Sequence, residues 1–191
     1  MYKKTDLSTG REISLIVSGR VRVYCSAPSG KELTLQIVEK GRLIGETSFL
    51  HFSDAYASVC AVNDVTLISC SVERLIPFIA GSEDSLKIIL QYLTETNISL
   101  ARHIKRIAIY NSRQKVASFL FYETQTDNPS GGIRNHTLPY THEELAVCLG
   151  MNRVTVTRIL SSFRKLGYIR TAYGKITVLR FELLKQEFEN I

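Results

Sequence analysis

The chain has 191 residues, of which 45% are hydrophobic and 22% charged, and its formal net charge is +6. This is the composition of a folded globular protein, and it excludes a disordered, collagen-like or disulfide-dense chain. No apolar run approaches the roughly 20 residues of a membrane-spanning helix, and the first residues lack the apolar core of a signal peptide. We therefore expect a cytoplasmic protein without a membrane partner, whose four scattered cysteines are reduced thiols.

Short β-rich runs occupy the chain from residue 13 to residue 76. They cover residues 13–17, 21–25, 33–38, 57–62 and 65–70, and turns rich in Gly, Ser and Pro separate the first three. Strands at this spacing predict a small antiparallel barrel or roll. We assign this domain to residues 1–80.

A helical pattern follows Pro77. Residues 85–111 contain neither Gly nor Pro, and their apolar side chains recur every three or four residues, as in a coiled-coil seam. The seam consists of Leu86, Leu90, Leu93, Asn97, Leu100, Ile104 and Ile107. A buried Asn97 would fix the register of two paired helices. We predict that residues 81–110 form a dimerisation helix; the alternative is a helix packed on its own barrel with Asn97 in solvent.

The C-terminal domain is assigned to residues 111–191 and begins with a helix over residues 112–124. One apolar face of this helix would consist of Val116, Ala117, Leu120 and Phe121. A loop of Asn, Pro, Ser and Gly follows it.

Two helices joined by a tight turn are predicted next. Thr141 and Glu144 have the spacing of a capping box at the start of the first helix, and Gly150 ends that helix. Asn152 can cap a second helix that runs from Arg153 to about residue 166. The inner face of this second helix consists of Val156, Ile159, Leu160 and Phe163. This is a helix-turn-helix, in which the second helix enters the major groove of DNA.

Positive charge is concentrated in the same region. No Asp or Glu occurs between Glu144 and Glu182, an interval that includes the second helix and a predicted two-stranded wing over residues 168–179. A folded segment with one sign of charge is typical of a surface that binds a polyanion, and a plain helical hairpin would not explain it. The candidate DNA-binding residues are Asn152, Arg153, Val154, Thr155, Thr157, Arg158, Arg164, Arg170 and Lys175.

These segments resemble the Crp/Fnr family of bacterial transcription regulators. The resemblance rests on Gly150-Met-Asn-Arg153-Val-Thr155-Val-Thr-Arg158-Ile-Leu160, on Gly174-Lys-Ile, on Ile16-Val-Ser-Gly-Arg-Val-Arg-Val-Tyr24 and on Gly41-Arg-Leu-Ile-Gly45-Glu46. It covers nearly the whole chain. It implies an α+β fold with an N-terminal antiparallel β-roll or barrel, a long dimerisation helix and a C-terminal winged helix-turn-helix. It also implies a homodimeric regulator without enzymatic activity that binds double-stranded DNA at an inverted repeat, and it raises RNA polymerase as a further partner.

Two departures from the family pattern concern the barrel's start and the recognition helix. The family has one or two further strands before the position of Tyr2, so this chain would start late in the barrel. The usual glutamate of the recognition helix is Val154 here, which can contact a thymine methyl but cannot accept a hydrogen bond from cytosine. Arg153 and Arg158 remain as residues that could bind guanine, so the half-site should differ from that of the glutamate-bearing members.

The third departure concerns the effector. The resemblance places an effector pocket at Gly45, Glu46, Tyr56, Leu100 and Ala101. In cyclic-AMP-binding members an arginine meets the cyclic phosphate, but Ala55 occupies its position here, and no Lys or Arg occurs from residue 43 to residue 73. Enclosing a phosphate without a cation costs a large desolvation free energy, although backbone amides can also bind phosphate. We predict no cofactor and an unidentified effector other than cyclic AMP.

The sequence leaves two functions of other classes open. One is a small-molecule-binding barrel whose helical C-terminal part mediates protein contacts rather than DNA binding. The other is a cupin-like metalloenzyme, which would need two or three neighbouring histidines where the barrel has only His51. We predict neither a metal site nor catalytic residues.

Overall fold

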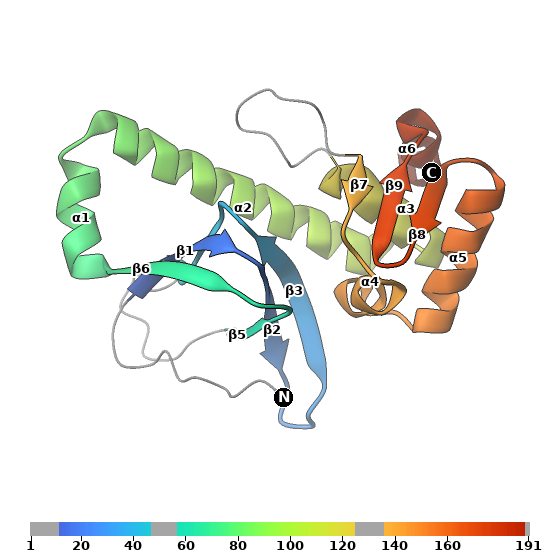
Figure 1. The fold of residues 1–191 in the computed structure, drawn as a ribbon, viewed down its shortest axis with the longest axis horizontal. Helices are drawn as coiled ribbons and strands as arrows, with labels where there is room; N and C mark the ends of the chain where they lie inside the picture. Colours follow the sequence, from blue (N-terminus) through green and yellow to red (C-terminus); the bar gives the residue numbers. More distant parts are fainter. Residues whose placement is uncertain (1–11, 47–56, 125–135, 190–191) are drawn as a thin grey trace. The chain divides into compact units, whose positions relative to one another are not determined.

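The computed structural model describes residues 12–46, 57–124 and 136–189 (Figure 1). The chain forms two compact units, residues 1–100 and 101–191. The division falls inside the long helix, before the boundary that the sequence suggested near residue 110, because the last turns of this helix belong to the C-terminal unit. The finer division into 1–80, 81–110 and 111–191 stays a prediction.

Within its described residues, the N-terminal unit contains two three-stranded antiparallel sheets, in agreement with the antiparallel barrel or roll that the strand spacing predicted. In one sheet β1 (Glu12–Ser18) lies between β4 (Leu43–Ile44) and β6 (Thr66–Ser71). In the other, β2 (Arg20–Ser26) lies between β3 (Glu32–Glu39) and β5 (Ser58–Ala61). Side chains from both sheets, Ile16, Val21, Val38 and Ile44, form the buried core. The sequence pattern did not predict β4, because two residues are too few to show the alternation of apolar and polar side chains that is typical of a strand.

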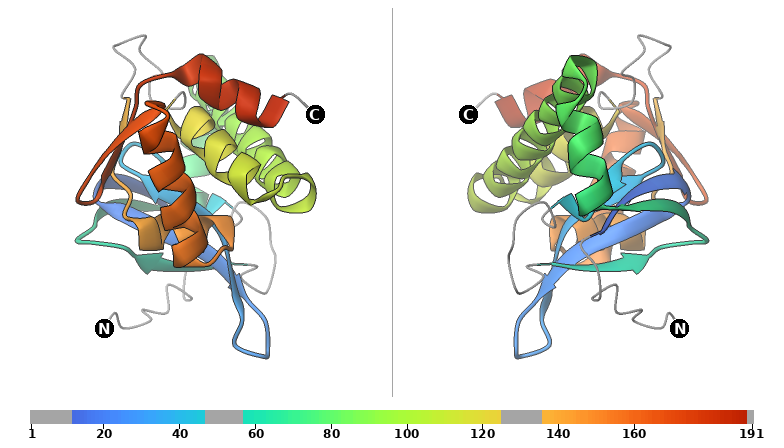
Figure 2. Two further views of the ribbon diagram at one scale, coloured as in Figure 1. Left: turned by 90° about the vertical axis from the view of Figure 1, so that its right-hand side faces the viewer. Right: turned by 90° about the vertical axis from the view of Figure 1, so that its left-hand side faces the viewer.

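A helix that the sequence did not predict, α1 (Val72–Ala80), follows β6 directly and contains Pro77. Proline removes a helical hydrogen bond, which is why the sequence suggested a break there. Val72 and Ile79 are buried, however, and α1 packs against β6 (Figure 2, right). Tertiary packing thus overrides the local preference.

The long helix α2 (Glu83–Ile109) has 27 residues, which gives a length of about 40 Å. The residues that it buries against its own chain are all polar: Thr96, His103 and Arg106. The apolar seam is left open. Leu86, Leu90 and Ile104 are 45%, 54% and 62% exposed, Ile107 and Asn97 are also exposed, and Leu93 and Leu100 are half-buried. Among the described helices, none is long and apolar enough to cross a membrane.

Over its described residues, the C-terminal unit combines four helices that follow α2 with a small sheet; Figure 2, left, shows this unit from the side. Its elements are α3 (Ser112–Glu123), β7 (Thr137–Leu138), α4 (His142–Leu149), α5 (Arg153–Lys165), β8 (Ile169–Ala172), β9 (Lys175–Val178) and α6 (Phe181–Glu189). The sheet order is β7-β9-β8. The sequence did not predict β7 or α6.

The helix α3 is more buried than the sequence suggested. Instead of one apolar face, all six residues from Val116 to Phe121 are buried, because both α5 and α6 pack against α3. Asn111, the last residue of the helical pattern over residues 85–111, lies outside α2. Its side chain accepts from the N–H groups of Arg113 and Gln114, so it caps α3 instead.

Candidate nucleic-acid interface

The predicted caps hold the turn between α4 and α5 in place. Thr141 Oγ1 accepts from the Glu144 N–H at 3.1 Å, and Glu144 Oε2 accepts from the Thr141 N–H at 2.7 Å. Gly150 has a φ of 59°, the left-handed conformation that glycine adopts without strain. Asn152 Oδ1 then accepts from the Val154 N–H at 2.7 Å and starts α5. The capping box and both helix boundaries of the turn are confirmed.

The inner face of α5 is the one predicted from the sequence. Val156, Ile159, Leu160 and Phe163 are all buried. The ring of Phe163 stacks on Tyr168, with centroids 5.7 Å apart. The opposite face is therefore fixed toward solvent.

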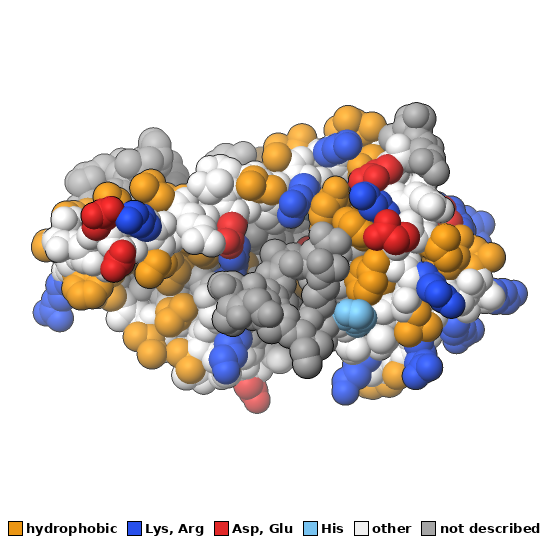
Figure 3. All heavy atoms as spheres, turned by 90° about the horizontal axis from the view of Figure 1, so that it is seen from above, with side chains coloured by type: hydrophobic (Ala, Val, Ile, Leu, Met, Phe, Trp, Pro, Cys, Tyr) orange, Lys and Arg blue, Asp and Glu red, His pale blue; other side chains and the backbone are white. Residues whose placement is uncertain are grey.

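The outward face of α5 is basic. Arg153, Arg158 and Arg164 are exposed, Thr155 and Thr157 are half-buried, and Val154 is 74% exposed. Arg153 Nε lies 3.7 Å from Glu143 Oε2 in an exposed ion pair, a contact that contributes little in water. Figure 3 shows Lys and Arg side chains gathered at the right-hand end of the molecule, where α5 lies in Figure 1.

The wing adds two further cations. β8 and β9 pair antiparallel from Ile169↔Val178 to Ala172↔Lys175, so Tyr173 and Gly174 form the turn. Arg170 and Lys175 are exposed on these strands, and Tyr173 at the tip is fully exposed. The structure records no ion pair of Arg158, Arg164, Arg170 or Lys175 with any residue that it describes, so these charges are available to a ligand.

Arg113 on α3, which the sequence did not single out, connects three helices. Its Nε and Nη2 donate to the two carboxylate oxygens of Glu187 on α6, both at 2.7 Å, and its Nη1 donates to Ser162 Oγ on α5 at 3.0 Å. The guanidinium also lies 4.5 Å from the ring centre of Phe163. The hydrogen bonds to Glu187 raise the pKa of Arg113. These contacts of Arg113 orient α5 from the side opposite its basic face. No local sequence pattern predicts them.

The sequence also missed His142, the first residue of α4. Its Nδ1 lies 3.0 Å from Thr157 Oγ1, on the outward half of α5. Partial burial and the nearby charges of Arg153 and Arg164 lower the pKa of His142. The neutral form of the imidazole is thus favoured beside the basic face.

The candidate effector residues lie partly within the described chain. Gly45 has a φ of 87°, and a Cβ atom there would lie 2.6 Å from the Glu12 carbonyl oxygen, so the backbone itself requires glycine. Glu46 is half-buried. Burial first, and then the charge of Glu46, raise the pKa of Tyr92 on α2. Tyr56 lies outside the described residues.

The cation nearest in sequence to this segment is already engaged. Arg42 Nη1 lies 2.8 Å from Glu95 Oε2, and its guanidinium is 4.9 Å from the ring centre of Tyr92. Tyr92 in turn donates to the Leu43 carbonyl at 2.7 Å. These contacts attach β4 to α2. Leu100 is half-buried and Ala101 exposed on α2, and their role in an effector pocket stays a prediction.

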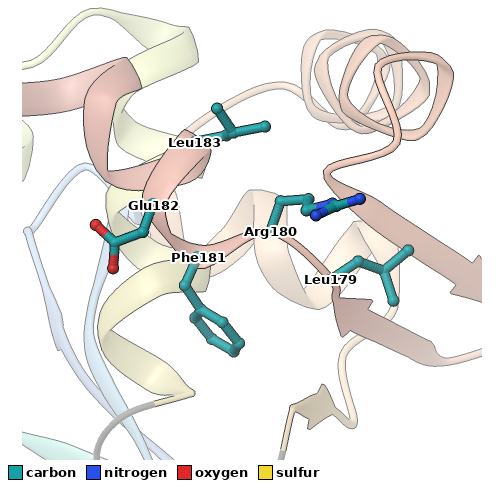
Figure 4. A pocket seen from close by; sticks show the side chains of 5 residues that line it. All are labelled: Leu179, Arg180, Phe181, Glu182 and Leu183. Atoms are coloured by element: carbon teal, nitrogen blue, oxygen red, sulfur yellow. The ribbon is translucent and has the colours of Figure 1, made fainter.

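A hollow of about 490 Å³ lies where β9 leads into α6. It is lined by Leu179, Arg180, Phe181, Glu182 and Leu183 (Figure 4). Their side chains point in different directions, and the ring of Phe181 packs edge-on against His136 at 4.7 Å. No polar groups converge there. The part of the chain described also contains no cluster of His, Cys, Asp or Glu that could hold a metal ion.

Two family models match the chain. A Crp-like helix-turn-helix domain matches residues 114–187, and a cyclic nucleotide-binding domain matches residues 5–82. Similar proteins include the transcriptional regulator SdrP of Thermus thermophilus, 30% identical over 92% of this chain and 83% of its own length. The cyclic AMP receptor protein of the same organism is 29% identical over 93% of this chain and 79% of its own.

Solved structures agree with this fold. A transcriptional regulator of the CRP/FNR family from Thermus thermophilus superposes with a TM-score of 0.66 at 28% identity, over 93% of this chain and 88% of that one. FixK2 from Bradyrhizobium japonicum, at 17% identity, gives a TM-score of 0.77 over 98% of this chain and 94% of its own.

Proposed function

The chain belongs to the Crp/Fnr family of DNA-binding transcription regulators, and on this basis we propose that it binds an inverted-repeat operator as a homodimer, with α5 in the major groove. The observation that carries this proposal is the outward basic face of α5 and the wing, whose exposed cations are free of strong internal pairing. The capped turn and the buried inner face hold that surface in a fixed orientation.

The contacts divide into two kinds. Arg153 and Arg158, near the start of α5, bind guanine through the O6 and N7 atoms, and exposed Val154 contacts a thymine methyl. The remaining cations contact phosphates, which adds affinity without sequence preference. The side chains that contact phosphates are Arg164, Arg170 and Lys175, together with the hydroxyls of Thr155 and Thr157. Asn152 contributes by capping α5.

The exposed seam of α2 supports the dimer. This helix buries the polar side chains of Thr96, His103 and Arg106. It exposes the apolar Leu86, Leu90 and Ile104, so its apolar face is turned away from its own chain. A second copy would bury these side chains, each of which contributes about 1.5–3 kcal/mol when fully buried. Asn97 on the same seam would pair with its symmetry mate. The two copies of α5 would then enter successive major grooves about 34 Å apart.

The effector we propose is one other than cyclic AMP. One relative is named as a cyclic AMP receptor protein, but in this chain Arg42 is paired with Glu95 and the sequence has no cation from residue 43 to residue 73. Gly45 is required by the close approach of the β1 backbone, since a Cβ atom there would lie 2.6 Å from the Glu12 carbonyl oxygen. We also propose that the protein is cytoplasmic, that its role is regulatory rather than enzymatic, and that it contacts RNA polymerase.

Selection of bound duplexes from a random DNA pool tests the function directly. The expected result is an enriched inverted repeat with guanines in each half-site, retained in a gel shift that weakens as salt rises. The alternative, a small-molecule-binding barrel whose C-terminal part contacts proteins, predicts no enrichment and no retention at any salt concentration. The double variant R153A/R158A is the matched control, since it should lose the enriched sequence and keep weak, salt-dependent binding.

A further inference from the structure

His142 lies between two elements of the proposed DNA-binding surface. Its Nδ1 contacts Thr157 Oγ1 on α5 at 3.0 Å. The preceding residue, Thr141, faces the wing turn, since a Cβ atom on Gly174 would lie 3.9 Å from Thr141 Cγ2. In helix-turn-helix proteins the first helix crosses the sugar–phosphate backbone while the second enters the groove. The start of α4 is therefore where a phosphate would pass.

We propose that His142 is an additional contact to the DNA backbone, that it takes up a proton from solvent when the duplex binds, and that DNA affinity therefore rises as the pH falls. This inference depends on the proposed function, because without DNA at α5 no phosphate approaches the imidazole.

The hydrogen bond to Thr157 suits both protonation states of the ring. A threonine hydroxyl can donate to the Nδ1 of a neutral imidazole, which leaves the proton on Nε2, or it can accept from the Nδ1–H of an imidazolium. In both cases Nε2–H remains a donor for a phosphate oxygen. The described residues offer Nε2 no partner of their own.

The charges around His142 set the direction of the effect. Partial burial first, and then the charges of Arg153 and Arg164 on α5, lower the pKa of His142. On α4 itself, Glu144 accepts from the Thr141 N–H and Glu143 lies 3.7 Å from Arg153 in an exposed ion pair. Neither carboxylate is among the causes of the pKa shift of His142. Lys175 follows the wing turn and is also positive. The phosphates of a bound duplex reverse this field and favour the protonated ring.

The sign follows from linkage. The gain in affinity is complete below the pKa of His142 in the free protein, and it is lost as the pH rises through the higher pKa in the complex. Each unit of pKa difference corresponds to a tenfold change per histidine, so a dimer that takes up two protons should change its affinity by about 100-fold for each unit of that difference.

The experiment measures the dissociation constant of a selected operator duplex between about pH 5.5 and pH 8 at constant salt, around the ordinary histidine pKa. The wild-type protein should bind more tightly at low pH. H142Q, whose amide can still bond to Thr157, should lose this dependence. H136Q is the matched control, because His136 is an exposed histidine of the same unit that packs on Phe181, and it should keep the dependence.

A second measurement follows the His142 ring resonances by NMR titration, in the free protein and in the complex. A pKa that rises on binding supports the proposal, and one that stays or falls overturns it. An equal pH dependence of the dissociation constant in wild type and H142Q also overturns the role of His142, while the proposed DNA-binding function still holds. If wild type, H142Q and H136Q all fail to bind the pool at every pH, the proposed function itself is wrong.

Discussion

Replacing Arg113 with methionine tests whether the contact behind α5 fixes the DNA-binding face. Methionine keeps the aliphatic stem of the side chain but removes every polar contact of the guanidinium. The lost contacts are the bidentate pair with Glu187, the hydrogen bond to Ser162 and the stacking over Phe163. These contacts join α3 to both α5 and α6, so their loss should loosen α5 without touching its outward side chains.

The magnitude follows from the geometry. The side chain of Arg113 is 37% exposed and that of Glu187 is 18% exposed, so solvent still screens the ion pair. We therefore assign the pair about 1 kcal/mol, the upper end of the range for surface ion pairs. The hydrogen bond to Ser162 adds about 0.5–1 kcal/mol, and the cation over an aromatic ring about 0.5–1 kcal/mol. R113M should therefore lower the free energy of unfolding of the C-terminal unit by about 2–3 kcal/mol.

Urea unfolding followed by circular dichroism measures this change, because the chain has no tryptophan to report by fluorescence. The double-mutant cycle with E187Q isolates the ion pair, for which we expect a coupling of about 1 kcal/mol. R102M is the control, since Arg102 stacks on Tyr122 at 4.5 Å and should lose only about 0.5–1 kcal/mol. Equal losses in R113M and R102M, with no coupling to Glu187, would refute the reasoning.

Four further changes address the interface, the dimer and the pH dependence of stability. R158A should lose about 1–3 kcal/mol of preference at one base position, and an equal loss on scrambled DNA would make Arg158 a phosphate contact. K175A should reduce the slope of log K against log salt by about 1 per wing, whereas an unchanged slope removes the wing from the interface. N97L should stabilise the dimer or change its order, and a wild-type monomer in sedimentation contradicts the seam. Burial and the charge of Arg106 lower the pKa of His103, so the free energy of unfolding should fall as the pH drops below about 6.5 in wild type but not in H103L, and an equal fall in both would contradict this assignment.

The elements with local signals were predictable. The capping box at Thr141, the cap at Asn152 and the buried face of α5 each depend on residues at most seven positions apart, and all are as predicted. Two of the elements that the sequence did not predict, α1 and β4, were missed for physical reasons. The nine residues of α1 contain a proline that local rules place outside helices, and β4 has only two residues.

The order of strands, long helix and winged helix-turn-helix follows from local patterns in the chain, because hydrophobic periodicity and caps are properties of neighbouring residues. What lies behind and beside the proposed DNA-binding face depends on tertiary packing. Arg113 meets Glu187 across 74 positions, and His142 meets Thr157 across 15. Such pairs depend on how separate helices pack, and polar residues in helices give no periodic pattern that would identify their distant partners.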